Sequence, residues 1–314
     1  MRKSALFIAG PTASGKSSLA LRVAEALGGV VINADSMQVY RDLAVLTARP
    51  GPAETARIPH ALYGTVDGDE AFSAGAWCQY AMIEVEAAWK EGRLPILVGG
   101  TGLYFRTIVE GIATVPDIPV DVRAQVRADM AAYGVGHMYN RLRVADPAMA
   151  EKLHAADSQR IARALEVIEA TGKSLSHYQE RTAPGPLKPL LDQGLLTRWV
   201  LNWPRAGLYA RCDARFEMMI NQGALEEVKA LLARGLPDDR PVMRALGVPS
   251  LSDYLSGHRD LSVAIERAKV QTRRFAKRQL TWFRHQCTDW QAVDAQDMET
   301  KTPDLISFMT RKIN

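Results

Sequence analysis

An octapeptide near the start of the chain, GPTASGKS at residues 10–17, most constrains the fold. It follows an apolar run at 5–9 and leads into a helical pattern, 18–27, that stops at two glycines. A strand, a glycine-rich loop and a helix in that order form a P-loop, whose curled backbone points amide N–H groups at a phosphate. The sequence therefore predicts that a diphosphate or triphosphate binds here.

Two side chains of the octapeptide add chemistry to the backbone. Lys16 can reach the outer phosphate oxygens, and the hydroxyl of Ser17 is a suitable Mg²⁺ ligand. We therefore expect Mg²⁺ as cofactor, with Ser17 as its protein ligand. The predicted phosphate-binding loop consists of Gly10, Pro11, Thr12, Ala13, Ser14, Gly15, Lys16 and Ser17.

Strand and helix patterns alternate after the P-loop. Apolar runs at 30–34 and 94–98 indicate buried strands, and 71–91 has a helical pattern. This alternation predicts an α/β fold with a parallel, doubly wound sheet flanked by helices. Because ligands bind such sheets at the carboxyl ends of the strands, the P-loop, Asp35 and Thr101 should converge on one crevice.

The pattern becomes helical in the middle third of the chain. No strand pattern is found until a proline-rich connector at 184–189 has passed, and 198–203 then indicates a strand again. The simplest interpretation is a discontinuous α/β core, 1–114 and 191–314, interrupted by a helical insertion domain at 115–190.

Composition limits the function classes. Of 314 residues 47% are hydrophobic, which suits one large or two ordinary domains, and a net charge of +4 permits a polyanionic partner without demanding one. Three scattered cysteines indicate neither a disulfide framework nor a zinc site. No signal peptide is seen, and no apolar run approaches the roughly 18 residues of a membrane span. We expect a cytoplasmic monomer without a membrane partner.

Asp35 and Thr101 each allow more than one interpretation. Asp35 follows an apolar strand, so it could be a carboxylate beside Mg²⁺, a base for a nucleophile, or a turn cap together with Ser36. Thr101 lies in the GGTG turn at 99–102. That turn could let the backbone approach a ligand closely, or it could simply be tight.

Two amphipathic helices, about 207–234 and 261–285, are expected to finish the chain. Arg211 and Arg215 share one face of the first helix and could clamp phosphate oxygens or pair with Glu217 and its neighbours. Basic and aromatic residues in the second helix suit contacts with a nucleic-acid backbone or form a solvated face.

Six sequence blocks resemble those of one family, the tRNA dimethylallyltransferases, which are also called tRNA isopentenyltransferases. The blocks occur in the same order as in that family. The resemblance covers residue 5 to about residue 290. The blocks are GPTASGKS at 10–17, DSMQVYR at 35–41, LPILVGGTGLY at 94–104, DSQRIARALEV at 157–167, RALG at 244–247 and AKRQLTWFR at 276–284.

The resemblance implies a P-loop NTPase-like core and a defined reaction. Members transfer the dimethylallyl group of dimethylallyl diphosphate to the exocyclic 6-amino group of adenine 37, just 3′ of the tRNA anticodon. Asp35 matches the general base, and Thr101 matches its partner beside the amine. From the residue types themselves, Lys16 is expected to help neutralise the leaving diphosphate, and Arg211 and Arg215 are assigned to diphosphate binding. The insertion embraces the anticodon stem-loop. The residues assigned to tRNA contact are Asp35, Ser36, Met37, Gln38, Thr101, Arg123, Gln159, Arg160, Ile161, Ala162, Arg163 and Arg244.

The match departs from the family in places. Residues 42–50 are DLAVLTARP, where the family usually has Gly-Met-Asp-Ile-Gly-Thr-Ala-Lys-Pro, and 59–62 are PHAL, where Pro-His-His-Leu is usual. Neither departure removes a residue with a chemical role.

Two other functions fit the same residues. One is a small-molecule kinase that binds ATP at the P-loop and clamps the transferred phosphoryl group with Arg211 or Arg215. The other is a non-catalytic, nucleotide-gated RNA-binding protein. The kinase would need no RNA, and the RNA-binding protein would tolerate loss of Asp35.

Overall fold

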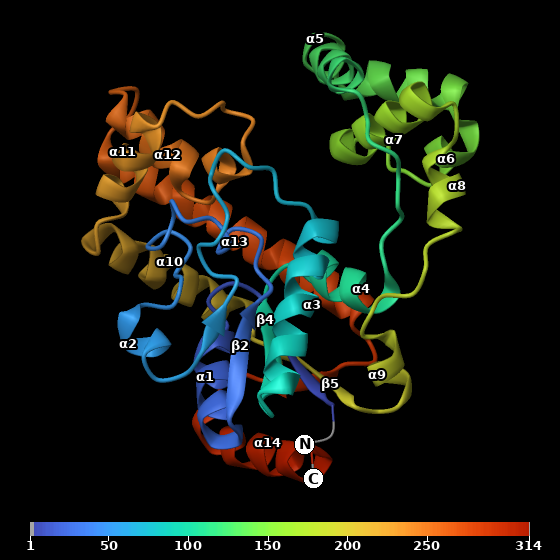
Figure 1. Ribbon diagram of the computed structural model, residues 1–314. Coiled ribbons are helices and arrows are strands. Elements are labelled where there is room, and N and C mark those ends of the chain that lie inside the picture. Colours follow the sequence, from blue (N-terminus) through green and yellow to red (C-terminus); the bar gives the residue numbers. More distant parts are fainter. Residues whose placement is uncertain (1–2, 314) are drawn as a thin grey trace. The chain divides into compact units, whose positions relative to one another are not determined.

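The computed structural model describes residues 3–313 and divides into two compact units. One unit runs up to Val109 and resumes at Pro186, and the other is Glu110–Gly185. Both boundaries lie five residues before the expected ones, at 110 against 115 and at 186 against 191. Figure 1 shows the chain leaving the larger unit after α4 and returning before α9.

The larger unit is built on a six-stranded sheet in the order β3-β2-β4-β1-β5-β6. All five strand pairs are parallel, so the predicted α/β sheet is confirmed. The strands are β1 (Ala5–Ala9), β2 (Gly29–Asn33), β3 (His60–Ala61), β4 (Leu94–Gly99), β5 (Leu196–Asn202) and β6 (Gln291–Asp294).

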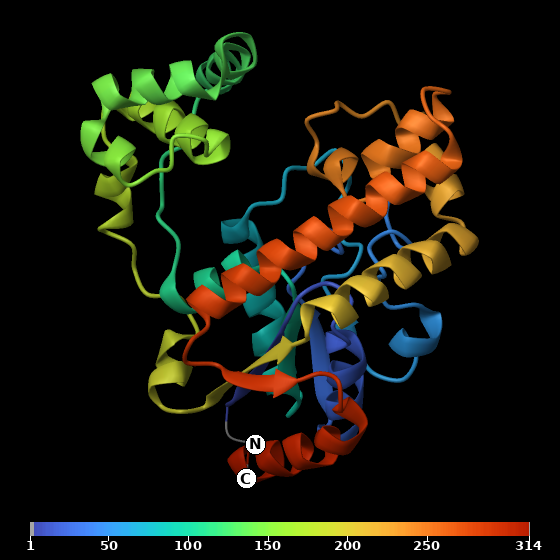
Figure 2. The same ribbon diagram turned by 180° about the vertical axis from the view of Figure 1, so that it is seen from behind.

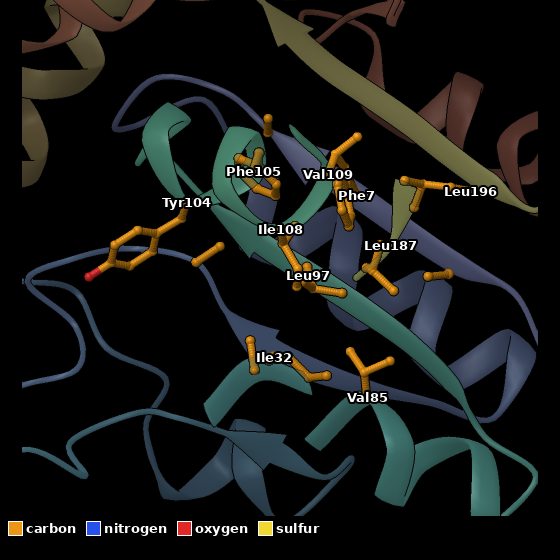
Figure 3. Close-up of a cluster of buried hydrophobic side chains, with 14 of the residues drawn as sticks. Phe7, Ile32, Val85, Leu97, Tyr104, Phe105, Ile108, Val109, Leu187 and Leu196 are labelled. Atoms are coloured by element: carbon orange, nitrogen blue, oxygen red, sulfur yellow. The ribbon is translucent and has the colours of Figure 1, made fainter. Parts of the chain in front are cut away.

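The side chains of β1 alternate between two apolar layers, as the pleat of a strand requires. Phe7 faces the layer formed with α3 (Ala74–Lys90) and α4 (Gly102–Glu110). Figure 3 shows this layer, in which the ring of Phe7 lies 5.1 Å from that of Phe105. Leu6 and Ile8 face the opposite layer, which includes α1 (Lys16–Leu27) and α14 (Met298–Ile313). Every residue of β1 is fully buried, so the P-loop extends from the centre of the core.

A group of helices follows β5 and encloses a third apolar cluster. The continuous helix expected at 207–234 is wrong, because Gly223 adopts a left-handed φ of 96° and separates two helices. The expectation that the helix at 261–285 finishes the chain is also wrong, since β6 and α14 follow it. These helices are α10 (Arg205–Asn221), α11 (Ala224–Ala233), α12 (Val248–Leu255) and α13 (Leu261–Gln286). Figure 2 shows the full length of α13 beside α10.

The unit Glu110–Gly185 consists of helices and their connecting segments, and none of its residues forms a strand. It has its own apolar core, which includes Met138, Leu142 and Leu165. Asp157 caps α7 by accepting the N–H of Arg160. The helices are α5 (Val120–Ala145), α6 (Pro147–Glu151), α7 (Ser158–Thr171) and α8 (Leu175–Gln179).

The remaining short helices are α2 (Pro52–Thr55), α9 (Lys188–Asp192) and the 3₁₀ turn η1 (Pro241–Arg244). Within residues 3–313, no helix is both long enough and apolar enough to span a bilayer.

Candidate active site

The P-loop connects the carboxyl end of β1 to the first turn of α1. Gly15 has a φ of 90° and Ala13 a φ of 62°, so both residues are left-handed. An alanine in that region is strained by roughly 1 kcal/mol or more, and such strain gathers at functional sites. The two left-handed residues curl the loop around a pocket of about 480 Å³ that residues 12–17 line.

Two arginines of α10 hold the P-loop from one side. Arg211 Nε donates to the carbonyl of Ala13 at 2.8 Å, and Arg215 donates to the hydroxyl of Thr12. Glu217 does not pair with either arginine, because it accepts a 2.6 Å hydrogen bond from Lys269. The structure therefore favours the interpretation in which both guanidinium groups serve the phosphate loop.

The side chain of Lys16 loses its proton more readily in this loop than a free lysine side chain does. Its Nζ donates to the carbonyl of Pro11 at 3.2 Å. Burial lowers the pKa of Lys16 to about 8; the carboxylate of Asp35 opposes this shift, and the positive charge of Arg215 adds to it. An anion in the loop would favour the ammonium form, because an opposite charge stabilises it.

Asp35 stands at the carboxyl end of β2, in a turn that Asn33 organises. The fully buried Asn33 side chain accepts the N–H of Asp35 at 2.8 Å and donates to the carbonyls of Asp35 and Leu62, each at 3.0 Å. Asp35 Oδ1 accepts the N–H of Met37 at 2.9 Å, so the turn-cap interpretation holds for that oxygen. Asp35 also lines the P-loop pocket, where its carboxylate could act as a base or lie beside a bound cation.

Thr101 joins the end of β4 to this turn. Its Oγ1 accepts the N–H of Ser36 at 2.9 Å and donates to the Ser36 hydroxyl at 3.3 Å. The expected convergence on one crevice is confirmed for the P-loop and Asp35, which line the same pocket. Thr101 is not among the residues that line this pocket or the apolar pocket described below, and it connects to the apolar pocket through its contact with Ser36.

Gln279, on α13, connects the P-loop to the turn after β4. Its Oε1 accepts the N–H of Thr12 at 2.8 Å, and its Nε2 donates to the carbonyl of Gly100 at 2.9 Å. The side chain is only 7% exposed. Sequence reasoning missed this role, as it missed that of Asn33. A signal was present, since Gln279 lies at helical spacing from the buried Ala276 and Phe283.

The glycines of the GGTG turn are required by neighbouring protein atoms. A Cβ on Gly99 would lie 1.9 Å from the carbonyl oxygen of Ala34, and one on Gly100 would lie 2.2 Å from Gln279 Nε2. A Cβ on Gly102 would meet the ring of Trp282 at 2.2 Å. The close approach expected here toward a ligand is therefore made toward the protein itself.

A second pocket, of about 260 Å³, adjoins the P-loop pocket. Both are lined by Thr12, Asp35, Thr47 and Arg215, so the two pockets lie side by side. The second pocket is more apolar, with walls that include Met37, Leu46, Phe216, Met219, Leu246 and Phe275. A larger pocket of about 520 Å³ lies along β5, β6 and α13 and contains none of the expected site residues.

The residues expected to contact tRNA are distributed over both units. In the larger unit, Arg244 lines the apolar pocket, and Gln38 Nε2 donates to the carbonyl of Thr47 at 2.7 Å. In the helical unit, the side chains of Arg123, Gln159 and Arg160 are exposed, Ala162 is half-buried, and Arg163 pairs with Glu166 at 3.3 Å. Ile161 is fully buried in the core of this unit. Direct RNA contact by the Ile161 side chain does not fit that burial.

The pocket offers oxygen ligands for a hard cation. Within residues 3–313, no group of three or more His, Cys, Asp or Glu side chains is placed to hold a metal. The Ser17 hydroxyl and the Asp35 carboxylate line the P-loop pocket. Mg²⁺ is commonly held by one or two protein oxygens plus substrate phosphates. The site therefore fits a divalent cation that binds with a diphosphate.

A family model described as IPP transferase matches residues 38–286. The chain belongs to the IPP transferase family. A tRNA dimethylallyltransferase of Azorhizobium caulinodans is 50% identical to it over 286 residues, or 91% of this chain and 90% of that protein. Another, from Rhodospirillum rubrum, is 52% identical over 90% of this chain and 85% of that protein. The family resemblance predicted from the six sequence blocks is confirmed.

Solved structures of the IPP transferase family have the same fold. The tRNA isopentenylpyrophosphate transferase of Bacillus halodurans is 34% identical, with a TM-score of 0.70 over 99% of this chain and 97% of that chain. A eukaryotic dimethylallyltransferase acting on tRNA matches with a TM-score of 0.78 at 28% identity, over 95% of this chain and 75% of that one. The predicted P-loop NTPase-like sheet is confirmed.

Proposed function

We propose that this chain transfers the dimethylallyl group of dimethylallyl diphosphate to the exocyclic 6-amino group of adenine at tRNA position 37 and releases diphosphate. Membership of the IPP transferase family is the observation that carries this proposal. The two adjacent pockets support it, since a phosphate loop, a carboxylate and an apolar pocket meet there.

The donor fits the crevice by its two chemical halves. Its diphosphate suits the P-loop pocket, where Lys16, Arg211 and Arg215 gather positive charge. Its five-carbon group suits the adjoining apolar pocket, because burial of hydrocarbon is favourable there. Arg215 lines both pockets, so it would stand where the breaking C–O bond joins the halves.

In the proposed reaction the allylic C–O bond breaks and a C–N bond to the adenine amine forms. Lys16, Arg211 and the P-loop amides neutralise the negative charge that develops on the leaving diphosphate. A divalent cation at Ser17, Mg²⁺ in our proposal, would add positive charge on the same oxygens.

The nucleophile needs a base, because the lone pair of the adenine amine is delocalised into the ring. Asp35 would accept the amine proton as the C–N bond forms. One of its oxygens caps Met37, which fixes the direction in which the other points. Thr101 would stand beside the reacting amine, held by its two hydrogen bonds to Ser36.

The acceptor base must leave its stack to reach this crevice, which costs a few kcal/mol. Contacts with the tRNA backbone must offset that cost. We propose that the helical unit supplies part of them, through exposed side chains such as those of Arg123 and Arg160. An anticodon stem-loop would then suffice as acceptor.

One assay tests the proposal against its rivals. The protein and Mg²⁺ are mixed with unmodified tRNA and either labelled dimethylallyl diphosphate or γ-labelled ATP. We expect prenyl label in tRNA, and none when guanine replaces the adenine 3′ of the anticodon. Transfer from ATP to a small molecule, with none from the prenyl donor, would favour the kinase. Bound tRNA without any transfer would favour the RNA-binding protein.

A further inference from the structure

One carboxylate anchors the loop at residues 42–50. Glu227, in the first turn of α11, accepts three consecutive backbone N–H groups from this loop. Its Oε1 accepts those of Ala44 and Val45 at 2.5 and 2.8 Å, and its Oε2 accepts that of Leu46 at 2.9 Å. Both oxygens are therefore engaged with a segment at least 181 residues earlier in the chain.

The loop depends on such an anchor because it belongs to no helix or strand. Three adjacent N–H groups without a ladder partner need an acceptor, and an ionised one makes the stronger hydrogen bonds. On the carbonyl side, Gln38 Nε2 donates to Thr47 and Ala48 at 2.7 and 3.2 Å. Glu227 thus holds the loop through three backbone N–H groups, and Gln38 holds it through two backbone carbonyl groups.

This loop forms part of the crevice wall. Leu46 and Thr47 line the apolar pocket, while Thr47 and Ala48 line the P-loop pocket. Leu46 is only 8% exposed. It also packs closely on Gly247, the residue before α12, because a Cβ there would lie 2.9 Å from Leu46 Cδ2. A small displacement of Leu46 would therefore change the shape of the apolar pocket.

We propose that Glu227 is a positioning residue that sets the selectivity for the hydrocarbon part of the donor. It acts through Leu46, which it holds as a wall against the prenyl group. The inference rests on the proposed prenyl transfer, since it concerns the fit of that donor. The simpler role for an acid in the first turn is stabilisation of α11 through the helix dipole. Glu226 occupies that same turn, is exposed and does not contact the loop.

The test compares Glu227→Gln with the matched control Glu226→Gln. Each variant is assayed for kcat and KM with dimethylallyl diphosphate and with the ten-carbon geranyl diphosphate. Glutamine removes the charge and turns an NH₂ group toward backbone N–H groups. We expect the KM of Glu227→Gln for the five-carbon donor to rise about tenfold, with kcat changed less than about threefold. The preference for five over ten carbons should fall about tenfold, and Glu226→Gln should match the wild type.

Inhibition by pyrophosphate separates positioning from general damage. Glu227 does not contact Lys16 or the two arginines of the P-loop, so the inhibition constant should stay within about twofold of the wild-type value. Equal loss of pyrophosphate and donor binding would mean a disordered crevice and would overturn the inference. So would an unchanged donor preference in an active Glu227→Gln.

Leu46→Ala keeps the inference testable if Glu227→Gln unfolds. This substitution removes the Leu46 side chain from the apolar pocket. It should therefore lower the preference for the five-carbon over the ten-carbon donor in a folded protein. In the double variant the two effects should be less than additive, because both act on one contact. Fully additive effects, or an unchanged preference in Leu46→Ala, would overturn the inference. If the wild-type protein transfers no prenyl group to tRNA, the proposed function fails first and this inference falls with it.

Discussion

The amide of Thr12 donates a 2.8 Å hydrogen bond to the side chain of Gln279, 267 residues later in the chain. Gln279 also donates to the carbonyl of Gly100, so one buried amide joins the phosphate loop to the turn that carries Thr101. Gln279 thereby adds a side-chain link between two loops whose strands, β1 and β4, are paired in the sheet.

Replacement of Gln279 by Leu should weaken both the fold and the reaction. It leaves a buried N–H and a buried carbonyl without partners, each of which costs about 1–3 kcal/mol. We expect a lower midpoint in urea unfolding and a loss of kcat/KM of about tenfold or more. Gln286→Leu, at the exposed end of the same helix, is the control and should change neither quantity. Wild-type values for Gln279→Leu would show that the bridge is dispensable.

Asp35→Asn isolates the role of Asp35 as a base from its role as a cap. The Asn side-chain oxygen can still accept the N–H of Met37, but the side chain cannot take a proton. We expect kcat to fall by about 10²-fold or more, with tRNA affinity within a few-fold and the unfolding midpoint unchanged. Asp35→Ala should lose similar activity and some stability as well. Normal turnover by Asp35→Asn would exclude it as the base.

The lowered pKa of Lys16 predicts that diphosphate binding depends on pH. The ammonium form binds an anion better, and it predominates below the pKa of about 8. Pyrophosphate affinity of the wild type, divided by that of Lys16→Gln, should therefore be constant below about pH 7 and fall between about pH 8 and 10. The ratio, measured by titration calorimetry, cancels the ionisation of pyrophosphate itself. A ratio that is flat across this range would contradict the assignment.

Substitution of Arg123 and Arg160 by Gln should weaken tRNA binding without affecting the donor. Both side chains are exposed, and each lost phosphate contact should flatten the slope of log affinity against log salt by about one unit. Binding isotherms over a salt series measure this slope. Ile161→Val serves as the control, because that side chain is buried and should leave the slope unchanged. Superimposable isotherms for the arginine variants would make both residues structural.

The sequence predicted those parts of the site whose residues lie close together in the chain or at the ends of neighbouring strands. The P-loop is one continuous motif, and the contact between Ser36 and Thr101 follows from the parallel pairing of β2 and β4, whose carboxyl ends these residues follow. The bonds of Gln279 and Glu227, and that of Asn33 to Leu62, could not be derived in this way, because each joins a side chain to backbone that only the folded chain brings near. The break in the helix expected at 207–234 depends on Gly223 alone, and a single glycine inside a helical pattern is often tolerated.

The order of the segments along the chain determines which contacts can form while the protein is still being synthesised. The first strand, β1, pairs with β5, which begins at Leu196, and the amide of Thr12 has no side-chain partner until Gln279 has been made. The helices of Glu110–Gly185 bury a core of their own, with contacts that are local in sequence, and such contacts form early. Residues 110–185 can thus bury their core as soon as they have been made, whereas the phosphate loop, although made earlier, gains its bond to Gln279 only near the end of synthesis.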